Sequence, residues 1–168
     1  MNPLNRVSCK KLLAAFSLTL FLNANAAHAE EYDMTGKVIS HNKHNIQEIA
    51  EGHMILFASM EESVVAEDYD DTPWKGVSGT CGGVVEIKGK EMKGNGFCTF
   101  TDAEKDKFVL AWEAQEMNEK GGPKGVWKIT GGSGKYEKAE AGGTYTDLAD
   151  DKEPTQSTVH LTGKMMIP

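Results

Sequence analysis

Short runs of residues that favour β-strands recur along this chain with turn-forming residues between them, and this rhythm constrains the fold most. The connectors are rich in Gly, Asp, Asn and Pro. Regular short strands with such turns are typical of antiparallel barrels and sandwiches, so an all-β fold is expected. Residues 45–51 have the pattern of a single helical turn. Strands are predicted at 34–40, 53–59, 77–87, 92–101, 107–114, 125–130, 143–148 and 158–167.

Residues 1–29 have the three-part pattern of a cleaved signal peptide. Three basic residues precede an apolar run at 12–22, and Ala-His-Ala at 27–29 is a small-x-small cleavage motif. As a helix, this run is too short to cross a hydrocarbon core of about 30 Å. We therefore expect export to the periplasm or the cell exterior, leaving residues 30–168 as a single β-barrel domain that is not held in a membrane.

The predicted strands 77–87 and 92–101 form the best-defined pair. The alternating pattern is centred on Gly89 and Lys90, and Gly at the first central position suits a two-residue type II′ turn. A bulge at Gly82-Gly83 or at Gly94 would shift the register by one residue. Without a bulge, the turn creates two cross-strand pairs of opposite charge, Lys88 with Glu91 and Glu86 with Lys93.

The same register places Cys81 directly opposite Cys98. This is a non-hydrogen-bonded position, where Cα atoms lie about 4.5 Å apart, at the short end of the disulfide range. An exported protein with two remaining cysteines is expected to oxidise them. The alternative is a redox-active or metal-binding pair, but the sequence has neither a C-x-x-C motif nor a second ligand pair at zinc spacing. A structural disulfide is the prediction.

A second glycine cluster resembles a known barrel signature. The segment ITGGSGKY at 129–136, followed by GGTYT at 142–146, resembles a pattern shared by allene oxide cyclases and dirigent proteins. The upstream stretch with Cys81, the run 94–102 and Trp112 is similar to small secreted bacterial proteins of this class. The resemblance implies an antiparallel barrel of about eight strands, allene-oxide-cyclase-like or calycin-like. The two families cyclise an epoxy fatty acid or orient phenoxy radicals, and none of their working residues can be matched here.

The late strands carry aromatic residues that are predicted to share the barrel interior. Such a barrel encloses room for side chains or one small ligand. The leading prediction is therefore a binding or accessory module that holds a small hydrophobic or aromatic molecule in its lumen. The candidate ligand-binding residues are Phe100, Trp112, Trp127, Tyr136 and Tyr145.

Two other functions stay open. One is a cyclase or isomerase acting on a confined hydrophobic substrate, with Glu113, Tyr145 or His160 as acid or base. Asp147 is the remaining titratable residue on the late strands that could supply such chemistry. Because no Ser-His-Asp or Cys-His arrangement is visible, an enzyme is the less favoured reading. The other is a structural barrel that forms homo-oligomers through its outer face.

Charge and ligand spacing argue against several kinds of partner. Signal cleavage removes three basic residues and no acidic one, so the formal charge changes from −7 to −10. This balance disfavours nucleic acids and anionic membranes. His41 and His44 form an H-x-x-H pair without cysteine or carboxylate ligands beside it, so no metal is predicted. No Gly-rich phosphate loop opens a helix, and no cofactor is expected.

Overall fold

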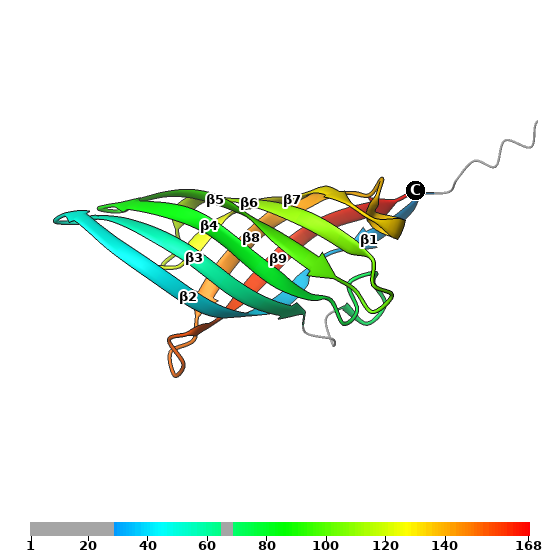
Figure 1. The fold of residues 1–168 in the computed structure, drawn as a ribbon, viewed down its shortest axis with the longest axis horizontal. Coiled ribbons are helices and arrows are strands. Elements are labelled where there is room, and N and C mark those ends of the chain that lie inside the picture. The colour runs from blue at the N-terminus through cyan, green and yellow to red at the C-terminus, as the bar shows by residue number, and fades with distance from the viewer. Residues whose placement is uncertain (1–28, 65–68) are drawn as a thin grey trace, which may run out of the picture.

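The computed structural model describes residues 29–64 and 69–168, and most of them lie in β-strands (Figure 1). No helix in these ranges is long and apolar enough to span a membrane. The predicted signal peptide lies outside the described residues, apart from Ala29. The elements are β1 (Glu30–Asp33), β2 (Gly36–Ala50), β3 (His53–Val64), β4 (Ser78–Lys88), β5 (Glu91–Thr101), β6 (Lys107–Met117), β7 (Pro123–Gly132), the 3-10 helix η1 (Gly134–Tyr136), β8 (Glu140–Ala149) and β9 (Gln156–Ile167).

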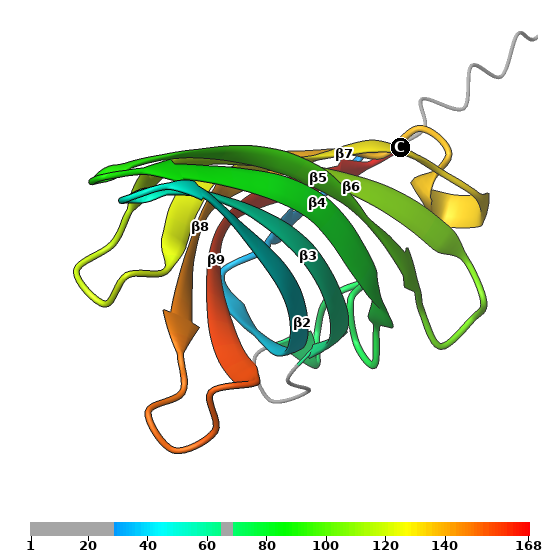
Figure 2. The same ribbon diagram turned by 60° about the vertical axis from the view of Figure 1, so that its left-hand side comes forward.

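Strands β2 to β9 close into an antiparallel barrel of eight strands. Each strand pairs with the next in sequence, and closure comes from β9, which pairs with β8 along one edge and with β2 along the other. Strand β1 was not predicted; it pairs with the end of β9 beyond β2. Figure 2 shows the strands curving around a common interior. The prediction of an all-β antiparallel barrel is confirmed.

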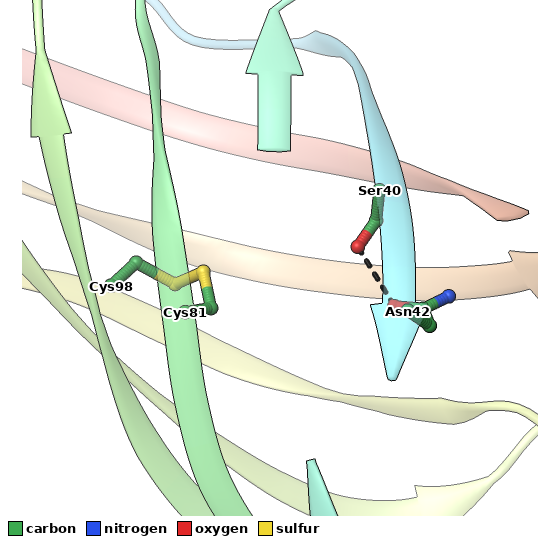
Figure 3. The surroundings of a disulfide bond; sticks show 4 residues. All are labelled: Ser40, Asn42, Cys81 and Cys98. Carbon is green, nitrogen blue, oxygen red and sulfur yellow. Dashed lines mark hydrogen bonds between the residues drawn. A yellow bond between two sulfur atoms is a disulfide. The ribbon is translucent and has the colours of Figure 1, made fainter. Parts of the chain in front are cut away.

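The β4–β5 hairpin has the predicted register. Lys88 pairs with Glu91 and Cys81 with Cys98, so no bulge interrupts the ladder. Gly89 has φ of 62°, the left-handed value that a type II′ turn requires at its first central position. Cys81 and Cys98 form a disulfide bond on the inner side of the barrel wall (Figure 3). The structural disulfide is confirmed.

The helical turn predicted at 45–51 is wrong. Strand β2 continues through this stretch to Ala50 and pairs with β3, so that Asn45 lies opposite Phe57. The chain then turns at Gly52, where φ is 70°. Pairing with a neighbouring strand satisfies the backbone groups of the whole segment, whereas an isolated helical turn would leave most of them to water.

The chain between β3 and β4 is described from residue 69 onward, and this part packs into one end of the barrel. Residues 69–77 bury Tyr69, Trp74 and Val77 almost completely. The indole of Trp74 stacks on the Phe108 ring, with the centroids 5.2 Å apart and 12° between the ring planes. This loop lies at the right-hand end of the barrel in Figure 1, away from the tips of the β2–β3 and β4–β5 hairpins. We refer to residues 69–77 as the plug.

Candidate ligand-binding site

A cavity of about 280 Å³ lies inside the barrel. It extends from Trp74 in the plug to the 120–123 connector and Pro154 near the opposite end. Its walls are mostly apolar, because alternate residues of each strand face inward and these positions carry aliphatic or aromatic side chains. The aliphatic lining includes Val38, Leu56, Met60, Leu110, Val159 and Leu161.

Two tryptophans shape the wall between β4 and β9. Trp112 and Trp127 are register partners on β6 and β7. The Trp112 ring lies against Gly83 and Gly96, where an added Cβ atom would clash with it, and Gly163 makes room for Trp127 in the same way. Trp127 Nε1 also donates a hydrogen bond to the carbonyl oxygen of Thr144 at 3.1 Å. The glycines therefore allow both indoles to lie flat against the wall.

Four of the five predicted ligand-binding aromatics line the cavity: Phe100, Trp112, Trp127 and Tyr145. Tyr136 is absent from this lining. It is fully buried behind the plug, with its ring 4.7 Å from that of Phe108, and its hydroxyl donates to the carbonyl oxygen of Pro73 at 2.7 Å. Burial and nearby carboxylates raise the pKa of Tyr136 strongly, so its hydroxyl stays neutral and fixes the plug. The binding role of all five aromatics stays a prediction.

The three acid/base candidates are separated. Tyr145 lies in the cavity wall, but Glu113 and His160 are exposed on the outer surface. Each of the two is a sequence neighbour of an inward residue, Trp112 or Leu161, and successive strand residues point to opposite faces. The outward positions of Glu113 and His160 do not fit the expectation that either is the acid or base for an enclosed molecule. A catalytic role for Tyr145 stays a prediction.

A chain of four polar side chains crosses the otherwise apolar inner wall. The Ser40 hydroxyl donates to Asn42 Oδ1 at 2.9 Å (Figure 3), and Asn42 Nδ2 donates to Ser157 Oγ, also at 2.9 Å. Ser157 is in turn a hydrogen-bond partner of the Asp147 carboxyl. Ser40 and Ser157 are buried, and they are register partners on β2 and β9. The chain therefore ends on an acidic group of β8.

Asp147 is one of three titratable residues that the sequence offers on the late strands, with Glu113 and His160, and the structure places it in the cavity wall. It lines the cavity, and its Oδ1 atom is buried without a hydrogen-bond partner among the described residues. Burial raises the pKa of Asp147, while the hydrogen bond from Ser157 and the charge of His44 partly oppose the rise. A carboxylate in this position is a strong acceptor whose capacity the protein leaves partly unused. The signal in the sequence was its two-residue spacing from Tyr145 on a strand with an apolar inner face.

We expect the Asp147→Asn substitution to stabilise the folded protein at pH 7 by about 1 kcal/mol, because it removes a desolvated charge while the side chain keeps a similar size. Since the pKa of Asp147 is raised in the folded state, the penalty is full above that pKa and is relieved as the pH falls through it. The gain should therefore shrink as the pH approaches 4. Denaturant unfolding of both proteins from pH 4 to pH 7.5 measures it. An equal or larger gain at pH 4 would contradict the assignment.

Comparison with known proteins supports the barrel fold. No protein-family model matches the chain, and no curated protein matches it either. Among solved structures, the chain is similar to that of the pterocarpan synthase dirigent protein GePTS1, with a TM-score of 0.51 and 16% identity over 83% of this chain and 87% of that chain. This likeness shows a dirigent-like barrel fold. The similarity to secreted bacterial proteins stays a prediction.

Proposed function

We propose that this protein is a binding module that holds a small apolar or aromatic molecule in the lumen of its barrel. The observation that carries the proposal is the cavity of about 280 Å³ with its aliphatic and aromatic lining. Small-molecule sites in proteins are typically concave and mostly apolar, with a few polar groups that fix orientation. The plug end is filled by stacked aromatic rings, so entry is proposed at the opposite end, near the 120–123 connector.

We further propose that the barrel works outside the cytoplasm, in the periplasm or the cell exterior. The Cys81–Cys98 disulfide supports this compartment, because disulfides form and persist in oxidising environments. The pattern at 1–29 predicts the same destination.

Titration with N-phenyl-1-naphthylamine tests lumen binding, because this uncharged probe becomes fluorescent in apolar surroundings. Leu110→Trp places a large side chain in the lumen, whereas Val109→Trp places the same side chain on the neighbouring outward position. We expect saturable binding to the wild type and to Val109→Trp, with at least a tenfold weaker affinity for Leu110→Trp. Unfolding curves confirm that both variants are folded. No saturable binding, or equal weakening in both variants, would contradict the proposal.

A further inference from the structure

The hydrogen bonds of the polar chain all run in one direction. Ser40 donates to Asn42, Asn42 donates to Ser157, and this leaves the single hydroxyl hydrogen of Ser157 for Asp147. The Ser40 hydroxyl and one of the two N–H groups of the Asn42 amide are therefore engaged before the carboxyl group is reached. Because an ionised carboxylate only accepts hydrogen bonds, the chain suits an ionised Asp147 and supplies it with one donor.

One oxygen of Asp147 still lacks a donor. Oδ1 is buried and has no hydrogen-bond partner in the described part of the chain, although Asp147 lines the cavity. A buried acceptor on a charged group that stays unpaired costs the protein free energy, and buried polar groups are usually satisfied. The position can accept one more hydrogen bond, and the neighbouring lumen is where the donor can enter.

The surrounding charges favour a neutral donor. His44 and Lys120 line the same cavity as Asp147, and Lys120 also lies 3.9 Å from the exposed carboxylate of Asp151. An ammonium group placed beside Asp147 would meet these basic side chains as well as the carboxylate. A hydroxyl group donates without adding a charge to an apolar site, where an incompletely paired charge is costly.

We propose that the lumen takes an uncharged, apolar alcohol, whose hydroxyl group donates a hydrogen bond to Asp147 Oδ1 while its hydrocarbon body lies against Leu110, Trp127 and Val159. The inference rests on the proposed function, since it names the chemistry of the molecule that the lumen would hold. It assigns Asp147 as the residue that determines specificity for the hydroxyl.

Three rigid probes of nearly equal shape test the assignment: 1-adamantanol, 1-methoxyadamantane and protonated 1-adamantanamine. Displacement of N-phenyl-1-naphthylamine gives their affinities for the wild type, for Asp147→Leu and for Asp151→Asn. Asp147→Leu removes the acceptor at similar size, and Asp151→Asn changes an exposed carboxylate near the same end. A hydrogen bond to a charged group contributes enough binding free energy for about a tenfold difference in affinity. The wild type should therefore bind the alcohol at least about tenfold more tightly than the ether.

The preference for the alcohol should disappear in Asp147→Leu and persist in Asp151→Asn, while the ether binds all three proteins about equally. The ether thus also reports that Asp147→Leu is folded. Equal affinity for alcohol and ether in the wild type, tighter binding of the amine, or failure of both neutral probes to displace the naphthylamine would overturn the inference. In each of these cases saturable naphthylamine binding leaves the proposed function standing, whereas its absence removes both.

Discussion

Replacing Trp74 with Ala should lower the free energy of unfolding by about 4 kcal/mol, near the middle of the range for truncating a buried tryptophan. The ring is 1% exposed and contacts Phe100, Phe108 and Trp127, so the substitution removes the centre of the aromatic cluster under the plug. It should also open the lumen at its closed end and accelerate the release of bound N-phenyl-1-naphthylamine. Guanidinium unfolding and stopped-flow dissociation measure the two effects.

The neighbouring Lys75 provides the control for Trp74. Its ammonium group lies 3.0 Å from Asp70, and both side chains are largely exposed. Exposed ion pairs contribute little, so Lys75→Ala should change stability by no more than about 0.5 kcal/mol. A loss below 1 kcal/mol for Trp74→Ala would show that the plug is not seated in the barrel in solution.

Replacing Asp102 with Ala should lower the free energy of unfolding by about 3 kcal/mol, the lower end of the range for breaking a buried ion pair. Its side chain is 1% exposed and lies 2.8 Å from Lys135 Nζ. The other carboxylate oxygen accepts hydrogen bonds from the backbone amides of Glu104 and Asp106. Asp102 thus holds the β5–β6 loop against η1. Urea unfolding measures the loss in the free energy of unfolding.

The pH dependence of the stability difference between wild type and Asp102→Ala tests whether the ion pair causes the loss. Burial by itself would raise the pKa of Asp102, but the hydrogen bond and charge of Lys135 and further hydrogen bonds outweigh it, so the pKa is lowered. The contribution of Asp102 is therefore complete above the unfolded-state pKa of about 3.9 and is lost as the pH falls through the lower folded-state value. The difference between wild type and Asp102→Ala should be constant from pH 5 to pH 8.

Glu104 is the matched control for Asp102, because it also contacts Lys135, at 3.0 Å, but is 74% exposed. Glu104→Ala should cost about 0.5 kcal/mol or less. Equal losses in the two variants would contradict the assignment of the buried pair. The acidic cluster of Asp102, Glu104 and Asp106 resembles a cation site in composition. The Lys135 ammonium group contacts Asp102 and Glu104, and the Lys135 backbone amide donates a hydrogen bond to Asp106, so we interpret the cluster as a structural contact between the β5–β6 loop and η1.

Local sequence was sufficient where a turn determined the geometry. Gly89 and Lys90 set the type II′ turn, and this turn determines every pair of the β4–β5 hairpin as far as the disulfide. The strand runs could be predicted in the same way, although several strands extend further than the pattern indicated. The stretch 45–51 was misjudged because it is polar and carries little β-signal, and its strand forms only through pairing with β3.

The site depends on contacts that the sequence does not display. The plug could not be predicted, because Trp74 follows an Asp-rich turn and its burial depends on the closed end of the barrel. Alternation divides β6 and β9 into two faces without showing which face is enclosed. Glu113 and His160 therefore stayed acid/base candidates in the sequence, although both lie on the outer face. The polar chain joins Asn42 to Ser157 across 115 residues, and no spacing rule connects them.

Intermolecular NOEs in the complex with N-phenyl-1-naphthylamine show directly whether a ligand occupies the lumen. The methyl groups of Leu110, Val159 and Leu161 line the cavity, whereas the side chain of Val126 is partly exposed on the outer face. We expect NOEs from the probe to the three cavity residues and none to Val126. NOEs to Val126 and other outward methyl groups, with none to the cavity residues, would contradict it.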